Sequence, residues 1–290
     1  MRAAVLCSLA GLLASVSSAA INTRLQYQAS HDGVTWSSTL PALPGDTVQV
    51  RALVSYIGSA SAPTAGGLGQ LVFQPVLTNL SAADLWNVTP LGAIGPVGGT
   101  RSTPLGTVSD SPGVWGRITP FGANATRGST YLRGFSHTVS GVNYLRIAQA
   151  NITNWIGVGA TSGSAAANNW SGGGGVSIAQ ISNPNRLSTD PVFNANTSNV
   201  VVFKFGIRVP VGNFPGTITI STPAEGIGRV TSAGSLYGTQ NARWFASASE
   251  VSSSLVGGVE VVDGTIAILP APGAVGVFGV AVLAALRRRR

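Results

Sequence analysis

The sequence is short of charged residues and of the residues that most often carry chemistry. Only 9% of its 290 residues are charged, and Lys204 is its one lysine. It contains one cysteine, Cys7, and two histidines, His31 and His137. One cysteine forms no intrachain disulfide, and two histidines with scattered acids make a zinc site improbable. The fold must therefore be stabilised by apolar burial, which a chain of this length can supply.

Patterns of catalytic residues are equally scarce. A catalytic histidine needs an orienting carboxylate and a nucleophile or water to activate, and we expect both histidines in surface turns, with Asp32 pointing away from His31. The sequence has no Gly-x-Ser-x-Gly elbow. Glu225 and Glu250 are the acids to test for glycoside hydrolysis, which needs two facing carboxylates. We predict no catalytic residue and no cofactor, and a secreted hydrolase ranks third among the possible functions.

A run of amide and carboxylate side chains offers the oxygen ligands that calcium prefers. It contains a single carboxylate, so we expect an ordinary loop and no metal site. A run of four glycines, Gly172–Gly175, lacks the Lys-Ser/Thr of a phosphate-binding loop and is expected to precede a strand. The possible calcium ligands are Asn183, Asn185, Asp190, Asn194 and Asn196.

The first twenty residues have the pattern of an export signal. Arg2 provides a small positive region, and Ala3–Val16 is an apolar run broken only by small residues and Cys7. Small residues then lead to Ala19 and Ala20, and we expect signal peptidase to cleave after Ala20 or Ala19. Because Cys7 would leave with residues 1–20, the mature chain is expected to contain no disulfide and no thiolate.

The net charge of +8 comes largely from the two ends of the chain. Without Arg2 and Arg287–Arg290, 12 basic and 9 acidic residues remain, a net charge of +3. The remaining arginines are scattered singly and are expected on the surface. Proteins that bind nucleic acid cluster their basic residues, so we predict no nucleic-acid partner.

Alternating apolar and polar residues predict half-buried β-strands in three segments, residues 47–56, 201–209 and 216–222. Two Asp-Gly pairs, Asp32-Gly33 and Asp263-Gly264, lie between strand-like runs and predict hairpins. The side chains expected in the core are Val48, Val50, Val54, Phe203, Phe205 and Ile207. Those expected in solvent are Arg51, Lys204 and Arg208.

Strand signals recur along the chain with almost no helical pattern between them; residues 81–86 could form one helical turn. This pattern predicts an all-β fold, an antiparallel β-sandwich of the Ig/cohesin-like or jelly-roll-like kind, in one domain over residues 21–269. We expect long end loops over residues 92–112 and 157–175. A split into two sandwiches near residues 151–185 is the alternative.

Tryptophans suggest a second possible function. Trp36, Trp155 and Trp170 lie in polar segments rich in Gly, Asn and Ser, where a large ring is hard to bury. Exposed tryptophans on a β-sandwich can stack on sugar rings, which would make the protein a carbohydrate-binding module for extracellular polysaccharide. The other interpretation is that each ring folds back over a sheet edge, which we favour for Trp36 and Trp244 because they lie in alternating runs.

The end of the sequence has three parts in order. Pro270-Ala271-Pro272 is followed by fourteen uncharged residues, Gly273–Leu286, and then by four arginines, Arg287, Arg288, Arg289 and Arg290. An apolar segment with a terminal basic cluster is a membrane-retention signal, because arginines stay on the cytoplasmic side. Residues 270–290 resemble the PEP-CTERM sorting signal of exported bacterial proteins, with Ala271 where the family has Glu. The resemblance implies a transmembrane sorting helix that an exosortase-like membrane protease recognises and cuts.

The segment from Tyr27 to Tyr56 adds a second resemblance. Its Asp-Gly-x-Thr-Trp and Pro-Gly-Asp-Thr-Val motifs, at residues 32–36 and 44–48, look like the opening of other PEP-CTERM protein bodies. The Pro-Gly-Asp-Thr-Val motif is also similar to that of cohesin-like sandwiches, whose role is protein binding. Together the sequence predicts a non-enzymatic cell-surface or extracellular-matrix protein. We expect it to be exported, anchored transiently in the inner membrane and then processed.

Overall fold

The computed structural model describes residues 21–80, 87–89, 92–94, 104–107, 116–118, 121, 131–149, 176–179, 197–211, 216–223, 227–228 and 242–270. All regular structure in these ranges is β-strand, with no helix, which confirms the prediction of an all-β body for them. The predicted signal peptide, the predicted helical turn at residues 81–86 and the tail beyond Pro270 lie outside the described residues.

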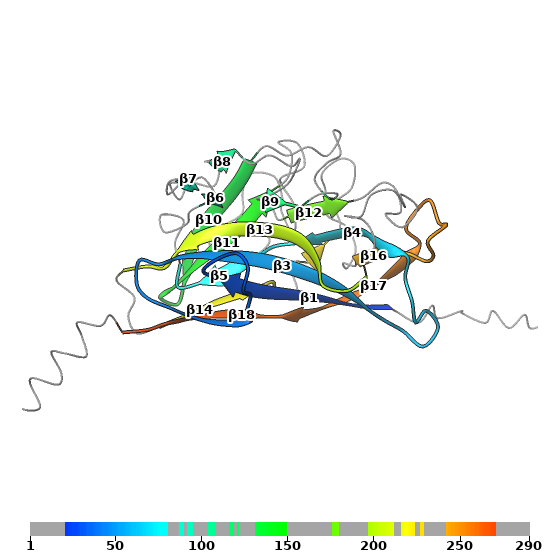
Figure 1. The fold of residues 1–290 in the computed structure, drawn as a ribbon, viewed down its shortest axis with the longest axis horizontal. Helices are drawn as coiled ribbons and strands as arrows, with labels where there is room; N and C mark the ends of the chain where they lie inside the picture. The colour runs from blue at the N-terminus through cyan, green and yellow to red at the C-terminus, as the bar shows by residue number, and fades with distance from the viewer. Residues whose placement is uncertain are drawn as a thin grey trace, which may run out of the picture.

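Five strands form one layer of the structure, in the order β17-β1-β3-β13-β9 (Figure 1). β1 lies inside this layer, antiparallel to β3 and parallel to β17. The bounds are β1 (Ile21–Ser30), β3 (Thr47–Gly58), β9 (Gly116–Arg117), β13 (Val200–Arg208) and β17 (Leu255–Val262).

The facing layer runs in the order β2-β18-β14-β5-β11-β12-β4-β16, and β16 continues by hydrogen bonding into β17. β10 pairs with β11 and β8, and β15 pairs with β4, while β6 and β7 form a separate pair. The bounds are β2 (Thr39–Ala42), β4 (Gly67–Phe73), β5 (Val76–Thr78), β6 (Asn87–Thr89), β7 (Gly92–Ile94), β8 (Pro104–Thr107), β10 (Tyr131–Val139), β11 (Val142–Gln149), β12 (Val176–Ala179), β14 (Gly216–Ser221), β15 (Ile227–Gly228), β16 (Ala242–Phe245) and β18 (Gly264–Ile268).

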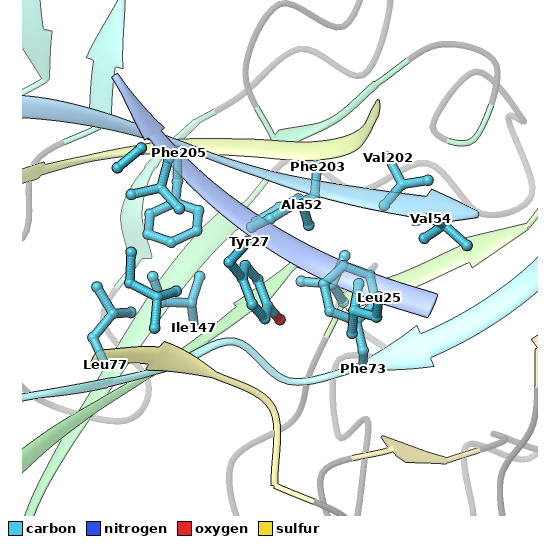
Figure 2. Close-up of a cluster of buried hydrophobic side chains, with 14 of the residues drawn as sticks. Leu25, Tyr27, Ala52, Val54, Phe73, Leu77, Ile147, Val202, Phe203 and Phe205 are labelled. Atoms are coloured by element: carbon cyan, nitrogen blue, oxygen red, sulfur yellow. The ribbon is translucent and has the colours of Figure 1, made fainter. Parts of the chain in front are cut away.

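The core lies between the two layers, because each strand turns every second side chain inward. Tyr27, Ala52 and Phe203 are register partners across β1, β3 and β13, and all three are fully buried. Figure 2 shows these side chains facing Phe73 and Ile147 from the other layer. All six side chains predicted in the core are buried, which confirms that part of the prediction.

Two contacts join the layers through the core. The rings of Phe73 and Phe203 pack edge to face with centroids 6.2 Å apart. The Thr222 hydroxyl donates to the Gln74 carbonyl oxygen at 2.9 Å, so it accepts from the Tyr27 hydroxyl at 2.5 Å. Without these bonds the Tyr27 and Thr222 hydroxyls would be buried without partners, which costs free energy. The two hydrogen bonds therefore fix how β1 lies over β4 and β14.

Neither predicted hairpin forms as expected. At Asp32-Gly33 the chain does turn back, but Ala29 and Ser37 form a single bridge before β2 leaves to pair with β18. At Asp263-Gly264 the chain crosses from β17 in one layer to β18 in the other, and these two strands do not pair. Gly264 is buried, and a Cβ on it would lie 3.0 Å from the Cβ of Tyr27. This glycine therefore permits close packing and does not form a hairpin turn.

Three further predictions need correction. The sandwich is not purely antiparallel, because β1 pairs with β17, β11 with β12, and β18 with β2 in parallel. The alternation over residues 201–209 would place Val201 inward. In β13 a bulge shifts the register, so Val202 is buried in its place. The expected loop at residues 92–112 contains β7 and β8, while the loop at residues 157–175 lies outside the described part of the chain.

Removal of the Tyr27 hydroxyl tests the link between the layers. Burial raises the pKa of Tyr27 far above its usual range, because the phenolate would lose its water shell. Above about pH 10 only the unfolded chain releases this proton, so Tyr27 makes the free energy of unfolding fall as the pH rises. We expect Tyr27→Phe to cost about 1–1.5 kcal/mol at pH 8 and clearly less at pH 11.

Urea unfolding at both pH values measures this difference. Tyr56→Phe is the comparison, because the half-buried Tyr56 hydroxyl donates to the Ala62 carbonyl oxygen within one surface segment and joins no layers. Burial raises the pKa of Tyr56 as well, but Tyr56 is less buried than Tyr27, so its change between pH 8 and pH 11 should be smaller. A Tyr27→Phe difference that is equal at pH 8 and pH 11 would contradict the argument.

Two neighbouring glycines in β17 test the pairing with β1. A Cβ on Gly257 would overlap the carbonyl oxygen of Ile21, whereas a Cβ on Gly258 would meet no atom within 4 Å. We expect Gly257→Ala to lower the free energy of unfolding by about 2 kcal/mol or more, and Gly258→Ala to change it by less than about 0.5 kcal/mol. Urea unfolding of both variants checks this, and equal losses would contradict the β1–β17 register.

Candidate functional site

The outer face of β1, β3 and β13 carries a group of polar side chains around one tryptophan. Gln28, Arg51 and Lys204 are register partners across the three strands, and Trp36 lies over them. The Arg51 guanidinium carbon is 4.4 Å and the Lys204 ammonium nitrogen 5.3 Å from the centroid of the Trp36 ring. Arg51 also donates from Nε and Nη2 to Gln28 Oε1 at 2.9 and 2.6 Å. We call these four residues the Trp36 cluster.

A compact turn holds Trp36 in this place. Asp32 Oδ1 accepts hydrogen bonds from the Ser30 hydroxyl and from the backbone N–H groups of Val34 and Thr35, at 2.7–2.8 Å. These bonds hold the pKa of the exposed Asp32 carboxyl well below its usual range. Gly33 has a φ of 74°, which favours glycine, and its carbonyl oxygen accepts from Trp36 Nε1 at 3.1 Å.

The Trp36 cluster places two cations directly opposite each other. Like charges in this position repel, and burial followed by repulsion from Arg51 lowers the pKa of Lys204. Burial also lowers the pKa of Arg51. The ring of Trp36 offsets the repulsion, because its negative face attracts both cations. The cluster therefore combines N–H donors with an aromatic ring that lies over them.

The sequence predicted this surface only in part. Trp36 is half-buried against the sheet, as the interpretation of a ring folded back predicts, and Trp244 is fully buried. Arg51 and Lys204 are half-buried and not freely solvated as expected, because the ring covers them. The outward positions of both residues were predictable from alternation, but the pairing of β3 with β13 was not.

The residues considered for catalysis do not come together in the described ranges. His31 Nε2 donates to the Pro41 carbonyl oxygen at 2.8 Å, and Asp32 is committed to its own turn. His137 lies in strand β10 and not in a turn as expected. The Glu250 carboxylate accepts from the Ala246 N–H in a local turn, which leaves it a structural role there.

Several predicted sites lie outside the described residues: Ala20, Ala271, Pro272, Arg287, Arg288, Arg289, Arg290, Trp155, Trp170, Glu225 and the possible calcium ligands. Within the described ranges no three His, Cys, Asp or Glu side chains are grouped so that they could hold a metal ion. No helix in these ranges is long and apolar enough to cross a bilayer. Arg117 and Arg146 are buried, in contrast to the expectation of surface arginines.

The structure includes Pro270, the first residue of the predicted processing motif, and β18 defines its position. This strand pairs up to Ile268, between Gly216 of β14 and Ala42 of β2. The N–H of Leu269 then donates to the Ala42 carbonyl oxygen at 2.8 Å, and Pro270 is exposed. The described part of the tail therefore ends with an exposed Pro270, two residues after the last residue of β18.

No family model and no curated protein matches the sequence. Several solved structures are distantly similar to this chain, and three of them are described here. The seventh ScaB type I cohesin from Pseudobacteroides cellulosolvens is 9% identical, with a TM-score of 0.32, 87% of this chain and 94% of that chain covered. CaCohA2 from Clostridium acetobutylicum is 9% identical, with a TM-score of 0.30 and coverage of 88% and 94%. The third ScaC cohesin from Acetivibrio cellulolyticus, solved with the ScaB dockerin, is 11% identical, with a TM-score of 0.30 and coverage of 86% and 99%.

A double-mutant cycle tests whether Trp36 and Arg51 stabilise the fold together. Trp36→Leu keeps an apolar side chain but removes the ring, and Arg51→Met keeps the stem but removes the charge. We expect the two changes to couple by about 0.5–1 kcal/mol in urea unfolding. The control combines Trp36→Leu with Arg24→Met, since Arg24 pairs at 3.8 Å with Glu260 and not with the ring. Additive effects in both cycles would show that the ring gives no cation-specific stabilisation.

Proposed function

We propose that this chain is an exported, non-enzymatic protein of the cell surface or extracellular matrix. Signal peptidase releases it after Ala20, and the apolar segment Gly273–Leu286 anchors it in the inner membrane. An exosortase-like membrane protease then cuts near Pro270-Ala271-Pro272. The observation that carries the proposal is the order of this motif, the apolar segment and the four arginines directly after the last strand of the body.

The position of the motif supports cleavage. β18 is held on both sides up to Ile268, so the protease would cut outside the core without disturbing a paired strand. Pro270 is exposed and begins the motif. Cleavage here would leave the whole sandwich intact on the outer side of the membrane, and the body would keep every strand described above.

The length of the apolar segment supports a transient anchor. Its fourteen residues would span about 21 Å as a helix, less than the roughly 30 Å of the hydrocarbon core. Extension through Pro272 and Pro270 would break the helix, because proline lacks the N–H and clashes with the preceding turn. The segment would therefore span only with the arginines reaching back to the interface and the bilayer locally thinned.

Replacement of all four arginines, Arg287 to Arg290, tests the sorting signal. In a bacterium that carries an exosortase, we expect mass spectrometry of the surface-extracted wild-type protein to find Ile21 at the N-terminus and nothing beyond about Pro272. Replacement by Ser removes the positive charges that cannot cross the membrane and that retain the chain there. The C-terminal segment should then remain uncut. Replacement by Lys keeps the charge and should still retain the chain in the membrane.

Arg24→Ser is the matched control, because it removes an exposed cation from the body and leaves the tail unchanged. It should be processed as the wild type. Detection of Arg290 on the surface-extracted wild-type protein would overturn cleavage and leave only a membrane anchor. Normal processing of the Ser variant would overturn the role of the arginines.

A further inference from the structure

Three exposed apolar side chains gather at the end of the body from which the tail leaves. Leu43, Val211 and Leu269 are 36%, 69% and 43% exposed. Leu43 begins the turn between β2 and β3, Val211 follows β13, and Leu269 follows β18. We call these three residues the exit rim.

Backbone hydrogen bonds bring the three segments of the exit rim together. The Leu269 N–H donates to the Ala42 carbonyl oxygen, next to Leu43, at 2.8 Å. On the other side of the turn, the Gly45 N–H donates to the Val209 carbonyl oxygen at 2.9 Å, two residues before Val211. Figure 1 shows β18 ending at this end of the long axis, whereas β1 begins at the opposite end.

From this arrangement we propose that the exit rim rests on the phospholipid surface while the tail anchors the chain; this rests on the proposed function above. Only Ala271 and Pro272 lie between Pro270 and the first apolar tail residue, Gly273. The three Cα–Cα steps from Pro270 to Gly273 reach only about 11 Å even when fully extended. The headgroup layer on one side of a bilayer is about 5 to 8 Å thick. The tether therefore holds this end of the body at the headgroups and brings the exit rim onto them.

The charged side chains beside the exit rim permit the same contact. The Asp46 carboxylate accepts the Leu43 N–H at 2.8 Å and keeps its negative charge, which a nearby cation offsets. Arg208, at the end of β13, is exposed. An apolar rim beside an exposed cation suits the boundary between acyl chains and anionic headgroups. A partner protein could bind the exit rim without this tether. The test below gives different results for contact with lipid and for contact with a protein.

A single fluorescent label at Val211 tests the proposal in the tail-bearing chain. Cys7 is the natural cysteine, so a Cys7→Ser background leaves Val211→Cys as the one labelled position. The chain is reconstituted in vesicles of phosphatidylethanolamine and phosphatidylglycerol that contain a phospholipid with a shallow nitroxide quencher. The matched control is Val251→Cys, which is 67% exposed in the loop between β16 and β17, towards the opposite end.

We expect the lipid quencher to reduce the label's fluorescence at position 211 at least about threefold more than at position 251. A separate variant labelled at Leu43→Cys should be quenched as strongly as the variant labelled at position 211. Equal quenching at 211 and 251 in chains that float with the vesicles would overturn the docking and leave the anchor intact. Protection of position 211 from aqueous iodide without lipid quenching would overturn it in favour of a protein contact. Failure of the chain to float with vesicles would overturn the anchor and the docking together.

Discussion

The buried hydroxyl of Tyr27 is the constraint on which the arrangement of the layers depends. The hydrogen bond to Thr222 joins residues 195 positions apart, and Thr222 in turn binds the chain just after β4. Since an unpaired hydroxyl in this core would be costly, the two layers can meet in only one relative position. Tyr27 also lies so close to Gly264 that a Cβ there would be tightly packed against it, at the point where β18 enters the second layer.

Alternation in the sequence predicts the strands well where both neighbours of a strand lie in the same layer. Val48, Val50 and Val54 are inward in β3, and Phe205 and Ile207 in β13, as expected. The bulge before Phe203 was not predictable, because it depends on how β13 meets β3. The prediction of a hairpin at Asp263-Gly264 was wrong. A glycine that permits close packing and a glycine that permits a turn look the same in a sequence.

The candidate sites divide in a similar way. Pro270 stays a prediction from the sequence, made from a local tail pattern, and the structure adds only that β18 pairs almost to that residue. The Trp36 cluster was not predictable as a unit, because it draws on β1, β3 and β13 and on a turn held by Asp32. An interaction among residues 28, 36, 51 and 204 depends on strand pairing, which residue spacing does not specify.

The parallel pairing of β1 with β17 has a consequence for how the protein folds. Ile21 lies beside Gly257, so a strand at the start of the sequence finds this partner only when most of the chain is present. Contacts of such high sequence separation slow folding and delay it until synthesis is nearly finished. If the chain is exported as proposed above, it would stay unfolded long enough to thread through a translocation channel. The topology itself would then postpone folding until the last strands have crossed.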